Sequence, residues 1–149
     1  MIYGVEVKPL NRIVDERGYL MEILRSDDEN FRDFGQAYVS ACQPGIIKAW
    51  HKHVFQTDQF CCVSGMLKIG LYDRRAGSPT EMETQTVVIG DLNPCLVIIP
   101  PGVWHGFKAL GNTMAVVLNL PDKAYNRENP DEQRASVNEF NYNWNTAGW

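Results

Sequence analysis

All three histidines of this 149-residue chain fall within two short segments. Gly45 is followed, after five residues, by His51-Lys52-His53, and residues 100–104 (Pro-Pro-Gly-Val-Trp) lead into His105. Alternate residues on a strand share a face, so His51 and His53 should project together, and a barrel can bring His105 beside them from another strand. Imidazole exchanges protons near neutral pH and also binds metals. The spacing predicts a histidine-centred site for a polar small molecule inside a barrel.

The segments around these histidines have the pattern of short β-strands. Helical periodicity is nearly absent, and β-branched and aromatic runs recur between turn signals. We therefore predict an all-β fold that closes on itself and so removes exposed strand edges. The predicted strands span residues 3–7, 19–24, 37–41, 46–50, 59–64, 66–72, 85–89, 96–99, 104–109 and 114–119. Segments 26–33 and 121–134 are predicted to be loops with short helical turns, of a length typical of lids.

Length and composition fit one domain, residues 1–149, and exclude several partners. A net charge of -4 without a basic stripe excludes nucleic acid as the main partner. No unbroken apolar run is long enough for a membrane anchor or an export signal. The four cysteines lack CXXC spacing and are expected to be reduced core thiols, as in a cytoplasmic protein; they are Cys42, Cys61, Cys62 and Cys95.

Two kinds of motif resemble known families. Gly45, His51, His53, Asp58 and Gly65 resemble the first cupin motif, with Asp58 where glutamate is usual, and residues 100–105 resemble the second. Longer segments, 15–22, 45–51, 65–80 and 99–107, resemble the dTDP-4-dehydrorhamnose 3,5-epimerase family. The resemblance implies a single cupin domain, which is a jelly-roll barrel or double-stranded β-helix.

The same resemblance implies an isomerase that acts on a nucleotide-linked 4-keto-6-deoxy sugar. In that family a proton leaves C3 or C5, beside the ketone, and returns on the opposite face, with no metal or organic cofactor. This chemistry needs a base, a stabiliser for the enolate oxygen and an acid across the sugar ring. Such sugars feed polysaccharide biosynthesis, so the implied setting is cytoplasmic. Family members are usually dimers that exchange N-terminal strands, and Tyr3, Val5 and Val7 alternate suitably for one.

Four residues take catalytic roles by the resemblance. His51 matches the family's base, and Tyr125 matches a loop tyrosine that donates the proton. Glu139, after Asn138, and Asp73 are rival matches for the carboxylate that orients the base. The sequence does not decide which of these two carboxylates orients the base.

Other residues match substrate contacts. Arg17 and Lys48 match cations beside the nucleotide diphosphate, and a pair of cations suits a dianionic pyrophosphate. Glu22 and Gln36 are candidate polar contacts.

One family residue has no counterpart. The lysine that polarises the keto group is missing from residues 57–60, so Gln59 or Lys68 is expected to stabilise the enolate. His53, where the epimerases usually have glutamine, and His105, which the metal-free epimerases also carry, are further candidate substrate contacts.

The residues themselves leave three alternative functions open. His51, His53, Asp58 and His105 are suitable ligands for Zn, Fe, Mn or Ni and would make the protein a metal-binding cupin. The His-X-His pair also resembles sugar 3,4-ketoisomerases, which return the proton to the same face. The third alternative is a non-catalytic barrel that binds a nucleotide sugar.

Overall fold

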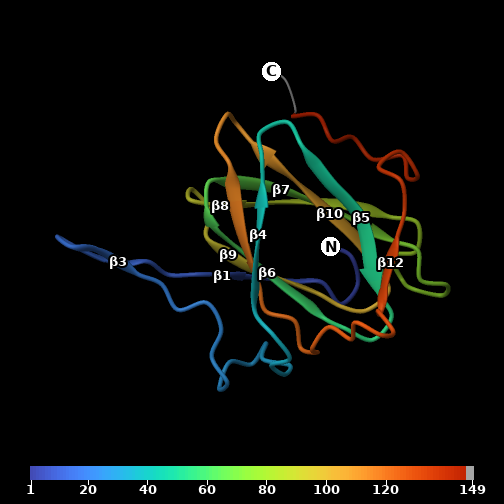
Figure 1. Cartoon of the computed structure of the whole chain (residues 1–149), viewed down its shortest axis with the longest axis horizontal. Helices are drawn as coiled ribbons and strands as arrows, with labels where there is room; N and C mark the ends of the chain where they lie inside the picture. The colour runs from blue at the N-terminus through green and yellow to red at the C-terminus, as the bar shows by residue number, and fades with distance from the viewer. Residues whose placement is uncertain (147–149) are drawn as a thin grey trace.

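Two β-sheets form the body of the molecule in the computed structural model, which describes residues 1–146 (Figure 1). The first sheet has the spatial order β1 (Glu6–Pro9), β9 (Cys95–Ile99), β6 (Asp58–Ser64), β11 (Ala115–Asn119) and β4 (Tyr38–Cys42). The second has the order β12 (Glu132–Arg134), β5 (Ile47–His53), β10 (Val103–Leu110), β7 (Met66–Asp73) and β8 (Thr84–Gly90). All these strand pairs are antiparallel. The arrangement is the all-β jelly roll of a cupin, which confirms the predicted fold class.

The main core lies between the two sheets. On β7 the alternate residues Leu67, Ile69 and Leu71 are fully buried and pack with Phe60 and Val97 of the first sheet. Burying each such aliphatic side chain contributes about 1.5–3 kcal/mol. The four cysteines are free and buried, as predicted.

A second apolar cluster covers the outer face of the second sheet. Trp50 and Trp104 alternate along their strands with His51 and His105, so the tryptophans face outward where the histidines face inward. The chain after β12 returns over this face and packs Phe140 against Trp50, with ring centroids 5.3 Å apart. This covering holds β5 and β10 in place and so fixes the direction of both histidines.

A two-stranded hairpin extends away from the barrel (Figure 1, blue). It pairs β2 (Ile13–Asp15) with β3 (Gly18–Leu20). Its apolar side chains are at least half exposed: Ile13 65%, Val14 72%, Tyr19 50% and Leu20 59%. Such a surface is typical of a segment that packs against another protein surface.

The structure differs from the sequence predictions at the short elements. β2 and β12 were not predicted, because a strand of three residues has no periodicity of its own and depends on its pairing partner. The strand predicted over 19–24 ends at Leu20, since Met21 and Leu24 instead pack on a separate apolar cluster. The predicted helical turns are wrong, because the loops within residues 1–146 contain only turns and bends. No helix in this range is long and apolar enough to cross a membrane.

Candidate active site

Four ionisable side chains meet inside the barrel. His51 and His53 come from β5, His105 from β10 and Asp58 from β6. His51 lies directly opposite His105 in the strand pairing, with ring centroids 4.1 Å apart and planes at 70°. One nitrogen of each of these rings and one carboxylate oxygen of Asp58 all lie within 4.8 Å of one another. The structure thus brings the three histidines together, as their spacing predicted.

Gly106 allows β10 and β5 to approach so closely. A Cβ atom at this position would lie 2.2 Å from the Cβ of Ala49 on the neighbouring strand. The pairing register also shifts between His105 and Phe107, an irregularity that often re-aims side chains beside a site. A larger residue at 106 would therefore push His51 and His105 apart.

Asp58 is the hydrogen-bonding centre of the cluster and is 1% exposed. Its Oδ1 accepts hydrogen bonds from Gln56 Nε2 and Asn119 Nδ2, both at 2.8 Å. Its Oδ2 lies 2.9 Å from His105 Nε2 and 3.4 Å from His53 Nε2. Burial alone would raise the pKa of Asp58, but the hydrogen bond and charge of His105, with the other donors, hold the pKa well below its ordinary value. Asp58 is therefore a carboxylate.

His105 has acceptors at both ring nitrogens. Nδ1 lies 3.0 Å from the carbonyl oxygen of Val103, and Nε2 lies 2.9 Å from the carboxylate of Asp58. A backbone carbonyl and an ionised carboxylate can only accept hydrogen bonds. Both nitrogens of His105 therefore face an acceptor, which holds the ring in place beside Asp58.

His51 has the properties of a base. Burial lowers the pKa of His51 well below its ordinary value, His105 lowers it further, and Asp58 partly opposes both. The imidazole is therefore neutral near pH 7, and among the described residues its ring nitrogens have no hydrogen-bond partner. A neutral ring with a free lone pair can accept a proton from a bound molecule.

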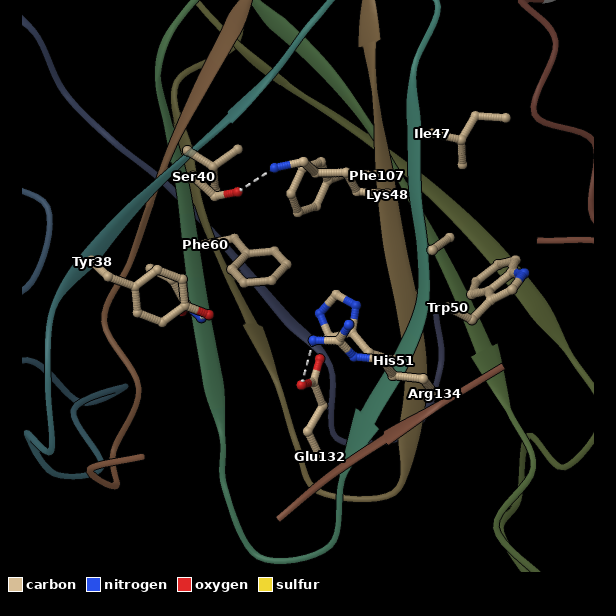
Figure 2. A pocket seen from close by; sticks show the side chains of 13 residues that line it. Tyr38, Ser40, Ile47, Lys48, Trp50, His51, Phe60, Phe107, Glu132 and Arg134 are labelled. Carbon is tan, nitrogen blue, oxygen red and sulfur yellow. Dashed lines mark hydrogen bonds and ion pairs between the residues drawn. The ribbon is translucent and has the colours of Figure 1, made fainter. Parts of the chain in front are cut away.

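The His51 ring lines two adjoining cavities of about 430 Å³ each, which share His51, Tyr38, Glu132 and Arg134 in their walls. The first runs between the sheets, and Figure 2 shows Tyr38 on one wall and His51 facing it from the other. The second opens toward the loop that holds Tyr125. Space of this size can receive a small polar molecule.

Of the other predicted contacts, three line these cavities. Lys48 lies in the first, where its Nζ donates a hydrogen bond to Ser40 Oγ at 3.0 Å (Figure 2). Gln36 and Tyr125 lie in the second, and Tyr125 is 47% exposed.

Neither carboxylate predicted to orient the base lies beside His51. Asp73 is fully buried, but its oxygens accept hydrogen bonds from Arg75, Ser78 and Thr80 and so close the loop after β7. Glu139 is exposed on the segment that covers the outer face of the barrel. Asp58, and neither Asp73 nor Glu139, is the carboxylate next to His51.

The two residues predicted to stabilise an enolate are also placed elsewhere. Gln59 donates a hydrogen bond from Nε2 to the carbonyl oxygen of Leu120 at 2.6 Å. Lys68 Nζ donates to the carbonyl oxygens of Asn143 and Asn145 at 2.7 and 2.8 Å. Neither side chain lines the two cavities around His51.

Arg17 lies on the projecting hairpin and Glu22 just after it, and both are outside the two cavities around His51. The side chain of Arg17 is 85% exposed and forms an ion pair with Asp15. Glu22 pairs with Arg25 at 2.9 Å. Neither Arg17 nor Glu22 therefore contacts the His51 site within its own chain.

Several residues that line these cavities were not predicted from the sequence. Glu132 and Arg134 lie on β12, where Arg134 pairs directly with His51, but that segment was predicted to be a loop. Tyr38 and Asn119 lie at the ends of correctly predicted strands. Gln36 and Tyr38 are two residues apart, so their side chains share a face on an extended strand. This spacing was the sequence signal that could have identified Tyr38 as a cavity residue.

The jelly roll, with a histidine and carboxylate cluster facing an internal cavity, defines the molecule as a cupin barrel. Residues 1–148 match the family model described as dTDP-4-dehydrorhamnose 3,5-epimerase. The chain belongs to this family of sugar epimerases.

Three relatives illustrate the similarity. The chain is 44% identical over 135 residues to the probable low-salt glycan biosynthesis epimerase Agl13 of Haloferax volcanii, with 89% of this chain and 86% of the other covered. It is 40% identical over 148 residues to the spore coat polysaccharide biosynthesis protein SpsL of Bacillus subtilis, with 98% of each covered. The crystal structure of a dTDP sugar isomerase from Desulfovibrio desulfuricans G20 superposes with a TM-score of 0.92 at 33% identity, covering 99% of this chain and 94% of the other.

Proposed function

We propose that the protein epimerises a nucleotide-linked 4-keto-6-deoxy sugar at C3, C5 or both, with His51 as the base and without a metal. The observation that carries this proposal is the neutral, unpartnered imidazole of His51 in the wall of an internal cavity. A ketone at C4 acidifies the hydrogens on its neighbouring carbons. His51 takes one of them, and the electron pair moves into an enolate that is reprotonated from the other face.

The cavity walls carry cationic side chains, which suit a negatively charged nucleotide sugar. Lys48 lines the first cavity, Arg127 the second and Arg134 both. Cations of this kind bind the dianionic diphosphate of a nucleotide sugar. Arg134 pairs with His51 across β12 and β5 and lines both cavities, where its guanidinium forms an ion pair with Glu132 at 2.9 Å. We assign to this guanidinium the role of the missing lysine near the enolate oxygen.

Asp58 and His105 position and tune the base. The Asp58 carboxylate raises the proton affinity of His51, which burial and His105 otherwise lower. Asp58 also fixes the ring of His105, which stacks edge-on against His51. This pair replaces the more distant carboxylates that the sequence suggested.

Metal-independence is supported by the donor set. Both ring nitrogens of His105 lie within hydrogen-bond distance of Val103 and Asp58, and both oxygens of Asp58 already have polar partners. A metal at His51, Asp58 and His105 requires the loss of these hydrogen bonds. The arrangement therefore fits a hydrogen-bonded cluster and not a metal centre.

The protein acts as a homodimer through the projecting hairpin. The exposed Ile13, Val14, Tyr19 and Leu20 pack on a second copy, and the hairpin carries Arg17 toward the diphosphate in the partner's cavity. Light scattering should give twice the 16.9 kDa chain mass, and Val14→Asp should yield monomers. A wild-type monomer that retains full activity would contradict this part of the proposal.

The reaction is tested by incubation with a dTDP-linked 4-keto-6-deoxy sugar in deuterated water, followed by NMR. Deuterium at C3 or C5 with inverted configuration supports the proposal. Migration of the ketone to C3 identifies a 3,4-ketoisomerase, the alternative suggested by His51 and His53. Nucleotide-sugar binding without any isotope exchange identifies a non-catalytic binding protein. Elemental analysis of protein purified without chelator should show substoichiometric metal, and one tightly bound metal per chain would contradict metal-independence.

A further inference from the structure

The loop between β11 and β12 carries Tyr125, the tyrosine that matches the family's proton donor. Its side chain lines the second cavity together with His51. Residues 123–130 are all exposed, so this part of the loop has no buried side chain of its own to hold it at the cavity. The position of Tyr125 therefore depends on the contacts that the loop makes at its two ends and through its backbone.

Two aspartates fasten the ends of this loop to the connection between β5 and β6. Asp122 Oδ1 accepts the backbone N–H of Thr57 at 2.8 Å, and the N–H of Asp122 donates to the Thr57 carbonyl oxygen at 3.2 Å. At the far end, the carboxylate of Asp131 accepts the backbone N–H groups of residues 54–56 at 2.9 to 3.0 Å. Thr57 directly precedes β6, so Asp122 ties the loop to a strand of the histidine cluster.

Gly35 lies against the backbone of the loop just before Tyr125. A Cβ at this position would lie 2.0 Å from the carbonyl carbon of Lys123, 2.2 Å from its Cα and 2.4 Å from the backbone nitrogen of Ala124. The N–H of Gly35 also donates to the carbonyl oxygen of Pro121 at 2.9 Å. The crowded atoms all belong to the backbone, so they cannot rotate away from a methyl group as a flexible side chain could. Any residue other than glycine at 35 requires the two segments to separate.

Separation of these segments would widen the rim of the second cavity. Gln36, next to Gly35, and Tyr125 both line that cavity. The loop has space to move, because a third cavity of about 230 Å³ is lined by residues 123–126 but not by Gly35. An alanine at 35 should therefore displace Tyr125 without unfolding the barrel. His51 lies on β5 within the second sheet and should keep its place.

We propose that Gly35 and Asp122 are positioning residues that hold Tyr125 beside the substrate, so that inversion depends on them and proton removal by His51 does not. The inference rests on the epimerase function proposed above, with Tyr125 as the acid that the sequence match predicts.

The two halves of the reaction need different groups. His51 alone supports isotope exchange, because it removes the proton from carbon, exchanges it with solvent and returns a deuteron to the same face of the enolate. Inversion needs the second donor as well: the enolate electron pair takes the phenol proton of Tyr125, the O–H bond breaks and the C4 carbonyl is restored. The proton held by His51 then returns to the phenolate through water, and no atom is oxidised or reduced.

The test compares Gly35→Ala, Tyr125→Phe and the double variant with the wild type in deuterated water, using the dTDP-linked 4-keto-6-deoxy sugar. Deuterium entering recovered substrate measures proton removal, and formation of epimer measures inversion. Gly35→Ala should lower inversion by about 10-fold or more, while exchange stays within about threefold of the wild-type rate. The double variant should invert no more slowly than Tyr125→Phe, because Gly35 acts only through that phenol. Ala37→Ser, which also adds one heavy atom at an exposed position of the same segment, is the matched control and should behave as the wild type.

Asp122 gives a second test, which also serves if Gly35→Ala does not fold by circular dichroism. Asp122→Ala removes the acceptor for the Thr57 N–H and should lower inversion more than exchange. Asp122→Asn keeps the Oδ1 acceptor, so its inversion should return to within about threefold of the wild-type rate. A general loss of stability would instead reduce exchange and inversion together.

The outcomes separate this inference from the proposed function. Wild-type inversion by folded Gly35→Ala or by Asp122→Ala would overturn the positioning role while leaving the epimerase intact. Equal loss of exchange and inversion in these variants, or a further loss when Gly35→Ala is added to Tyr125→Phe, would do the same. Absence of both exchange and inversion in the wild type would overturn the epimerase, and this inference with it.

Discussion

Two buried aspartates, Asp58 and Asp73, show how similar side chains serve different purposes in one barrel. Both are at most 1% exposed, and both have a pKa held below the ordinary value by hydrogen bonds that outweigh burial. Asp73 bonds to Arg75 and two hydroxyls of its own loop, none of which faces a cavity. Asp58 bonds to His105 beside His51. A perturbed buried carboxylate therefore indicates a site only when its partners face space for a ligand.

Replacing Asp58 should have the larger effect on activity. Unit charges 4.8 Å apart, the upper separation of the nearest His51 and Asp58 atoms, interact by roughly 3 kcal/mol at an effective dielectric constant of about 20. Asp58→Asn should therefore reduce kcat by up to ~10²-fold, because the protonated form of His51 loses its counter-charge. Steady-state kinetics measure this, and unchanged kcat in a folded variant would remove Asp58 from the mechanism.

Asp73→Asn is the matched substitution in the other region. An amide cannot accept all the hydrogen bonds that Asp73 now accepts, and the Arg75 guanidinium loses its buried partner. The free energy of unfolding should fall by about 1–3 kcal/mol while kcat stays at the wild-type value. Urea titration and kinetics on the same preparation check this, and a large loss of kcat without destabilisation would restore Asp73 as a candidate orienting residue.

The pH dependence should separate the two regions further. Because burial lowers the pKa of His51, the acidic limb of kcat/KM should lie below the ordinary imidazole value of about 6.5, and Asp58→Asn should move it lower still. Asp73 has a lowered pKa in the folded state, so its stabilisation is present above about pH 4 and is lost as the pH falls further. Asp73→Asn should therefore lose less stability than the wild type on acidification. An acidic limb at or above the ordinary value would contradict a buried base.

Lys48 should give the smallest effect. Its ammonium is exposed and bonded to Ser40, so Lys48→Met removes one of several cations near the cavity. KM should rise by up to about tenfold with kcat nearly unchanged, because a partly exposed charge contributes ~1 kcal/mol. The effect should shrink as salt is added, and a loss confined to kcat would instead place Lys48 at the reacting atoms.

The sequence was sufficient to predict the barrel and the histidine cluster because both follow from local patterns. Alternation places His51 and His53 on one face, and a strand pair brings His105 opposite. The partners of the carboxylates could not be predicted, because Asp58 meets Asn119 across 61 positions of sequence. Arg134 was missed for a related reason, since its three-residue strand forms only against β5. Residue type and local spacing identify candidate ionisable residues in the sequence. Only the pairing of strands in the folded barrel shows which side chains and cavities those residues contact.

The account depends most on His51 removing a proton from carbon inside the barrel. The most direct measurement is the rate of deuterium incorporation beside the ketone of a dTDP-linked 4-keto-6-deoxy sugar, in the wild type and in His51→Asn. The account predicts incorporation by the wild type and a rate lower by about 10²-fold or more in the variant, with the fold unchanged. Equal incorporation by both proteins would contradict it.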